Sequence, residues 1–195
     1  MATVDQYKVS NAAGQDRLAE SFGLPKDTTA AKVLPYMTDY VQEFIGNAPF
    51  AVMATSDAQG NSDASPKGGT PGFVRVIDDR HLLFPDVAGN KLFQSYKNVE
   101  ANPHIGLLFM IPGVNDTVRV NGIVTIVEKN ELDRRNIELS LYEYDDNSKH
   151  IQGMLVEVTE SYPHCPRAYK FSDIWNVEAI KANQENRRFR REIPN

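Results

Sequence analysis

The 195-residue sequence contains a single cysteine, Cys165, which excludes an intramolecular disulfide and a cysteine-rich metal site. No apolar run approaches the roughly 20 residues that a membrane-spanning helix requires. The first residues are polar and lack the apolar core of a signal peptide. Basic residues are fewer than acidic ones, 21 against 26, and the resulting net charge of −5 argues against a basic nucleic-acid-binding surface. We therefore expect a cytoplasmic protein that binds neither nucleic acid nor a membrane.

Recognisable catalytic and metal-binding patterns are also missing. The four histidines are scattered without an HxH or HxxxH pair, which argues against a metal site. The acidic pairs 78–79 and 145–146 lie in turn-like sequence and do not have the character of catalytic carboxylates. Cys165 follows His164, but no base and acid are arranged around it, so a packed, inert cysteine is expected. The catalytic residues therefore stay unknown at this stage.

What remains is the composition of a globular protein, with 41% hydrophobic and 24% charged residues. Residues 1–35 are predicted to form an N-terminal helical extension, in which Gln15 to Phe22 form a helix ended by Gly23 and Pro25. Residues 36–176 carry the main domain. Residues 177–195 are predicted to form a helical tail with an arginine-rich end.

The main domain reads mostly as β-structure. A helix with its apolar face at 37, 40, 41, 44 and 45 comes first, and the sequence changes to β-type from Pro49 onward. Short strands are predicted at 50–55, 62–67, 73–77, 81–84, 104–111, 117–127 and 154–158. Several of them are adjacent in the chain, which favours antiparallel pairing. The predicted fold is mainly β with peripheral helices, a closed or partly open barrel.

Three polar clusters fall on predicted strand ends or turns. They are Ser65-Pro66-Lys67-Gly68-Gly69, Asp86 with Gly89-Asn90-Lys91, and Arg119 with Asn121. A helix is expected to begin at Asn90-Lys91, where free backbone N–H groups favour an anion. The three cationic side chains of these clusters could neutralise a phosphate. Taken singly, each cluster also fits an ordinary solvated turn.

Taken in order, these residues resemble the flavin-binding split-barrel family related to pyridoxamine 5′-phosphate oxidase. The resemblance covers roughly residues 36–176 and is closest to a subgroup of FMN-dependent enzymes whose reaction is not established. The matching segments are 45–50, 65–68, 72–76, 84–91, 102–103, 107–113, 117–122, 164–168 and 174–175.

The resemblance implies a six-stranded antiparallel split β-barrel that works as a homodimer, with FMN in two clefts at the interface. It implies that Lys67, Asn90 and Lys91 meet the FMN phosphate. Ser65 and Gly68 would lie along the flavin, with Pro85 and Asp86 near its ribityl chain. Arg119 and Asn121 would reach FMN held mainly by the partner subunit, and Trp175 would cap the ring.

One departure from the family pattern limits the functional hypothesis. The oxidase itself carries an arginine and a histidine in a C-terminal motif that holds pyridoxal phosphate, whereas residues 186–191 here contain arginines and no histidine. The sequence therefore predicts an FMN-binding oxidoreductase acting on an unknown small molecule, with NADH or NADPH as candidate electron donor. A flavin-binding protein without turnover, a split barrel holding deazaflavin or haem, and true pyridoxamine 5′-phosphate oxidation stay open as alternatives.

Overall fold

The computed structural model describes residues 15–87, 92–134 and 150–186. The chain divides into two units, Met1–Lys32 and Val33–Asn195. The first unit holds helices α1 (Gln15–Phe22) and α2 (Asp27–Ala30). α1 ends where the sequence predicts, because Gly23 adopts a φ of 81° and its N–H donates to the Ala19 carbonyl at 2.8 Å.

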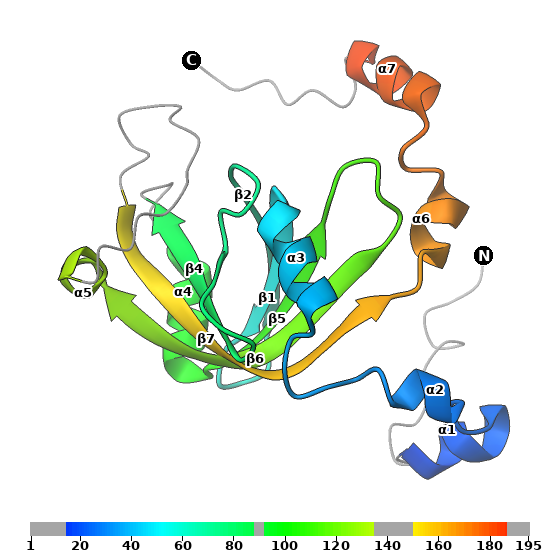
Figure 1. Ribbon diagram of the computed structural model, residues 1–195, viewed down its shortest axis with the longest axis horizontal. Helices are drawn as coiled ribbons and strands as arrows, with labels where there is room; N and C mark the ends of the chain where they lie inside the picture. Colours follow the sequence, from blue (N-terminus) through cyan, green and yellow to red (C-terminus); the bar gives the residue numbers. More distant parts are fainter. Residues whose placement is uncertain (1–14, 88–91, 135–149, 187–195) are drawn as a thin grey trace. The chain divides into compact units, whose positions relative to one another are not determined.

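The second unit is built on one antiparallel sheet of seven strands (Figure 1). The strands are β1 (Phe50–Ser56), β2 (Ser62–Gly68), β3 (Arg75–Val76), β4 (His81–Val87), β5 (His104–Met110), β6 (Thr117–Glu128) and β7 (His150–His164). Their order across the sheet is β2-β1-β5-β6-β7-β4-β3. The predicted mainly antiparallel β fold with peripheral helices is confirmed, and it is consistent with a split barrel.

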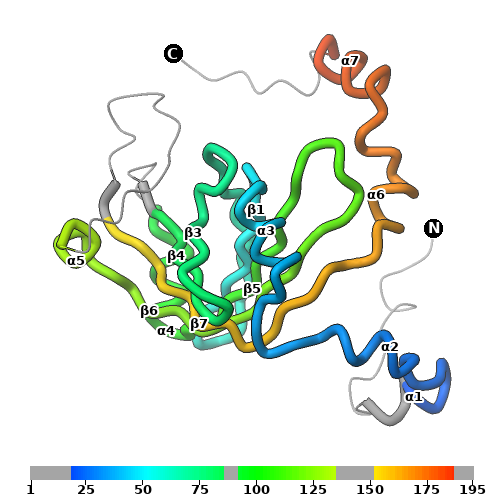
Figure 2. The backbone as a smooth tube through the Cα atoms, viewed as in Figure 1, coloured from blue at the N-terminus to red at the C-terminus, as the bar shows by residue number. Residues whose placement is uncertain are grey.

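Two features of the sheet differ from the expected six-stranded barrel. The seventh strand is β3, a two-residue strand paired with β4 (Figure 2), whereas Phe73 and Val74 before it are buried in a loop. The sheet is also not closed, since its end strands β2 and β3 form no ladder with each other in the part of the chain that the structure describes. β7 is longer than predicted because it pairs with β6 on one side and with β4 on the other.

Alternation along the strands gives the sheet a buried and an outer face. In β1, Ala51, Met53 and Thr55 are buried, whereas the residues between them are half-buried or exposed. α3 (Asp39–Asn47) lies on the concave, buried side (Figure 1) and inserts Val41, Phe44 and Ile45. The core cluster therefore fills the space between α3 and the sheet.

α4 (Gln94–Ala101) departs from the prediction for the helix after β4. It begins at Gln94, not at Asn90-Lys91, because Phe93 has left-handed backbone geometry with a φ of 51°. The sequence spacing of Leu92, Phe93, Tyr96 and Val99 predicts one apolar helix face. Tyr96 and Val99 are buried, whereas Leu92 is 62% and Phe93 40% exposed, so this prediction is only half correct.

The remaining helices are α5 (Lys129–Arg134), α6 (Arg167–Ser172) and α7 (Val177–Glu185). α5 buries Leu132, while α6 and α7 bury no residue. Within the described ranges, none of the helices is both long and apolar enough to cross a membrane.

Candidate functional site

Ser65, Lys67 and Gly68 lie on the edge strand β2. In the ladder with β1, Ser65 pairs with Met53 and Lys67 pairs with Ala51. Paired residues of an antiparallel ladder project from the same face, so Ser65 and Lys67 project to the buried face. Lys67 is half-buried, and no carboxylate among the described residues lies within ion-pair distance of its ammonium.

Arg119 and Asn121 lie on the opposite, outer face of the sheet. Arg119 of β6 pairs with Leu108 on one side and Tyr162 on the other, and Asn121 pairs with Gly106 and Glu160. The single chain therefore does not bring Lys67 and Arg119 together, because the sheet separates them.

Tyr162 holds the Arg119 side chain. The guanidinium lies 5.6 Å from the centroid of the Tyr162 ring, and its Nη1 donates to the Tyr162 hydroxyl at 3.0 Å. No carboxylate of the described residues lies within 4.0 Å of this half-buried guanidinium. Its positive charge is therefore available to an anion.

Arg119 lines a cavity of about 170 Å³ between the outer face and α6. The Tyr169 hydroxyl is buried there without a hydrogen-bond partner in the described structure, and burial raises the pKa of Tyr169. Its ring packs edge-on against Trp175, with centroids 5.8 Å apart. The full lining is Leu108, Asn115, Thr117, Arg119, His164, Cys165, Ala168 and Tyr169.

Trp175 contributes to this cavity through Tyr169 and is not one of its lining residues. Its Nε1 donates to the Val114 carbonyl at 3.0 Å, which fixes the indole beside the turn between β5 and β6. Cys165 is exposed and lines the cavity, so the expectation that this cysteine is packed is wrong.

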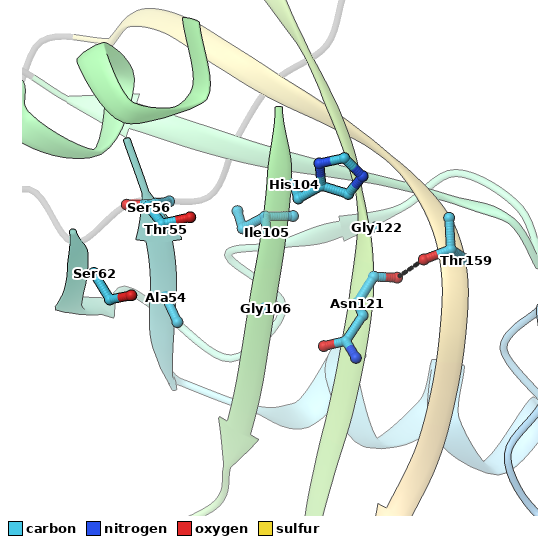
Figure 3. A pocket seen from close by; sticks show the side chains of 10 residues that line it. All are labelled: Ala54, Thr55, Ser56, Ser62, His104, Ile105, Gly106, Asn121, Gly122 and Thr159. Carbon is cyan, nitrogen blue, oxygen red and sulfur yellow. Dashed lines mark hydrogen bonds between the residues drawn. The ribbon is translucent and has the colours of Figure 1, made fainter. Parts of the chain in front are cut away.

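Asn121 lines a second cavity, of about 360 Å³, on the same outer face (Figure 3). The Asn121 Nδ2 donates to Glu160 Oε1 at 3.0 Å. A bulge at Asn121/Gly122 shifts the β6–β7 register, and the Thr159 hydroxyl donates to the Asn121 carbonyl at 3.2 Å (Figure 3). The full lining is Ala54, Thr55, Ser56, Ser62, His104, Ile105, Gly106, Asn121, Gly122 and Thr159.

The predicted phosphate turn is only partly described. Pro85 pairs with Gly153 of β7, and Asp86 pairs with Gln152. Asn90 and Lys91 lie outside the described residues, so their predicted role stays a prediction.

A third cavity, of about 600 Å³, is the largest of these three. It lies beside α5 and contains none of the predicted site residues. Its walls are Ile77, Leu83, Thr125, Ile126, Val127, Glu128, Asn130, Glu131, Leu132, Arg134 and Leu155. The described residues contain no group of three or more histidine, cysteine, aspartate or glutamate side chains that could hold a metal ion.

Sequence reasoning missed Tyr162, Tyr169 and His104 as site residues. Tyr162 could have been found from β alternation, since its pairing with Arg119 only requires extending the last predicted strand. Tyr169 and His104 are isolated aromatic residues in the sequence, and no local pattern distinguishes them from packing residues.

Comparison with known proteins places this geometry in a context. The family model for pyridoxamine 5′-phosphate oxidase matches residues 37–158. No curated protein matches the chain.

Several solved structures have a similar fold. A proposed pyridoxamine 5′-phosphate oxidase from Lactobacillus delbrueckii has 18% identity and a TM-score of 0.50, over 66% of this chain and 95% of that chain. A tagged HupZ variant from Group A Streptococcus has 19% identity and a TM-score of 0.49, over 66% and 99%. An FMN-binding protein from Syntrophomonas wolfei has 14% identity and a TM-score of 0.48, over 64% and 83%. At such identities the first of these supports the shared fold alone.

Proposed function

Because the chain belongs to the pyridoxamine 5′-phosphate oxidase family, we propose that it binds FMN and uses it as an oxidoreductase on a small molecule. The observation that carries this proposal is the state of Arg119. A half-buried guanidinium with a tyrosine partner and no carboxylate within 4.0 Å in the described structure can pair with the charge of a bound anion. A phosphate monoester provides this charge and accepts several N–H groups at once.

The separation of the two cations supports a homodimer as part of this proposal. Lys67 and Arg119 project from opposite faces of one sheet, so one chain cannot direct both at one ligand. In the proposed dimer, Lys67 of one copy and Arg119 of the other approach the same FMN. Each of the two equivalent sites would then need both chains.

The chain's own residues would bind and orient the cofactor. Lys67 and Arg119 would neutralise the phosphate, together with the predicted Asn90 and Lys91. Trp175 would keep Tyr169 in the wall of the Arg119 cavity and so limit access of water. When bound, FMN supplies electron and hydride transfer at its isoalloxazine ring, with NADH or NADPH as the proposed electron donor.

Titration of the purified protein with FMN and with riboflavin tests the phosphate assignment. Loss of a charge-assisted hydrogen bond costs about 1.5–3 kcal/mol, so Arg119→Gln should weaken FMN binding roughly 10- to 100-fold. Riboflavin has no phosphate and should bind the wild type and the variant equally. Arg75→Gln is a matched control, since Arg75 is an exposed arginine on the edge strand β3. Failure of the wild type to bind FMN, or equal FMN affinity in Arg119→Gln, would contradict the proposal.

Turnover is tested separately from binding. The FMN-loaded protein should be reduced by NADH or NADPH, and the flavin absorbance should recover on exposure to air. Binding without any reduction would favour a flavin carrier or sensor. If the purified protein shows the absorbance spectrum of a deazaflavin or of haem, that group and not FMN is its cofactor.

A further inference from the structure

His104 has one ring nitrogen fixed by a chain of hydrogen bonds. The Asn102 Nδ2 donates to the Ser56 hydroxyl at 2.9 Å, which orients the Asn102 amide. The Asn102 Oδ1 then lies 2.8 Å from the His104 Nδ1. A carbonyl oxygen only accepts, so His104 Nδ1 carries a proton. In the neutral ring, Nε2 is therefore an acceptor.

His104 lines the 360 Å³ cavity on the outer face, together with Asn121 (Figure 3). One N–H of the Asn121 Nδ2 donates to Glu160, and the Asn121 Oδ1 is available as an acceptor. The Ser62 and Thr159 hydroxyls at the same space donate to the Gly60 and Asn121 carbonyls, so their oxygens remain as acceptors. The Ser56 hydroxyl can both donate and accept. Among the residues that the structure describes, no lysine or arginine belongs to the lining.

This donor and acceptor pattern selects the ligand by its chemistry. A carboxylate or phosphate would face imidazole and amide acceptors without a cation to balance its charge. A neutral molecule with N–H or O–H groups would satisfy those acceptors. The volume is also sufficient for a single-ring compound.

We propose that this cavity binds a neutral hydrogen-bond donor, an amide or an alcohol, with His104 Nε2 and Asn121 Oδ1 as its acceptors. The proposal deepens the proposed function and rests on it for the ligand's role. Asn121 and Arg119 lie two residues apart on the same face of β6, so a ligand here would lie beside the proposed FMN site. The ligand would then be the substrate of the flavin reaction.

Gly106 provides a way to narrow the cavity without disturbing the fold. A Cβ at Gly106 would lie 3.5 Å from Asn121 Oδ1 and 3.8 Å from Ala54 Cβ, which are ordinary contact distances. Gly106→Ala should therefore fold normally and crowd the Asn121 acceptor. His104→Phe removes the other acceptor and keeps an aromatic ring.

Benzamide and benzoate form a matched pair of probes, because they share a shape and differ in charge and donors. Binding is followed in the wild type by NMR of the His104 ring nitrogens, and the same titrations are repeated in the variants. Benzamide should bind at least about tenfold more tightly than benzoate, the scale of one hydrogen bond, and should shift the Nε2 resonance. His104→Phe and Gly106→Ala should each weaken benzamide binding. His81→Phe, outside the cavity, should leave it unchanged.

Preference for benzoate, or no effect of either cavity variant, would overturn the assignment of this site. If His104→Phe fails to fold, two measurements still test whether the cavity binds a neutral donor. They are benzamide binding to Gly106→Ala and the comparison of benzamide with benzoate in the wild type. Benzamide binding is measured without FMN, so loss of FMN affinity would contradict only the proposed function. If FMN displaces benzamide, the cavity is part of the FMN site, and its assignment as a separate substrate site is wrong.

Discussion

The Arg119 guanidinium rests against Tyr162 in two ways, with its carbon 5.6 Å from the ring centroid and Nη1 3.0 Å from the hydroxyl. The two residues are cross-strand partners of β6 and β7. The ring orients the cation but does not neutralise it, since a cation–π contact leaves the charge in place. Tyr162 would therefore be a positioning residue for the anion that we propose at Arg119.

Tyr162→Phe separates the hydroxyl from the ring. The variant keeps the cation–π contact and loses one hydrogen bond, which contributes about 0.5–1.5 kcal/mol. FMN affinity should fall by a factor of roughly 2 to 13, measured by fluorescence titration, while riboflavin affinity stays constant. This loss should be smaller than that of Arg119→Gln. An equal or larger loss in Tyr162→Phe would show that Tyr162 contacts the cofactor directly.

Replacing two glycines on neighbouring strands by alanine should change the free energy of unfolding by different amounts. A Cβ at Gly122 would lie 2.4 Å from the Glu157 carbonyl oxygen and 2.6 Å from Val156 Cγ1, so the β6–β7 ladder would have to move. Gly122→Ala should cost about 1–3 kcal/mol of unfolding free energy, the range for overpacking. Gly106→Ala meets only ordinary contacts and is the matched control. Urea denaturation should rank wild type and Gly106→Ala together, well above Gly122→Ala.

The inner side of α4 is fixed by a buried amide. The Asn98 Nδ2 donates to the Thr55 hydroxyl at 3.0 Å and to Asp63 Oδ2 at 2.8 Å, joining α4 to β1 and β2. Asn98→Leu should destabilise the protein by about 1–3 kcal/mol, because it leaves Asp63 without this donor. Asn102→Leu at the helix end loses its bonds to the Ser56 hydroxyl and to His104 Nδ1, but these are less buried than the Asn98–Thr55 bond. It should therefore cost less in thermal unfolding. The reverse ranking would show that the Asn98 amide does not anchor α4.

Local sequence patterns predicted the strands well. The apolar run at 50–55 and the largely apolar stretch at 117–127 correspond to β1 and β6, each of which buries one face. The β3 prediction was too long, since Phe73 and Val74 are buried in a loop and not in a ladder. A short apolar run in the sequence can belong to a buried loop as well as to a strand, because both require apolar side chains.

The site was harder to predict, because the face of the sheet from which a side chain projects depends on the register of strand pairing. Lys67 and Arg119 were both identified from sequence as cationic candidates, yet their separation by the sheet follows only from the pairing of β2 with β1 and of β5 with β6. His104 has no local signal at all. Its tautomer is set by Asn102, whose orientation depends on Ser56, 46 residues away in the sequence.

The turn before β4 should contribute to acid sensitivity through Asp78. Its Oδ1 accepts from the Arg80 backbone N–H at 2.8 Å and lies 2.8 Å from His81 Nδ1. The Arg80 backbone N–H is the largest single cause of an Asp78 pKa below its usual 3.8, and His81 lowers that pKa further while desolvation opposes both. Because the folded pKa is lowered, this stabilisation is present above pH 3.8 and is lost as the pH falls through the folded pKa.

Asp78→Asn should therefore lower stability at neutral pH by a small amount, up to about 1 kcal/mol for such an exposed group. The difference from wild type should shrink below pH 3.8 and disappear once Asp78 is protonated in the folded state. Unfolding free energies measured by urea between neutral pH and the acid limit check this. His81→Phe should retain part of the pH dependence, because the backbone N–H groups of residues 80 and 81 remain. Loss of the whole dependence in His81→Phe would assign the stabilisation to the imidazole instead.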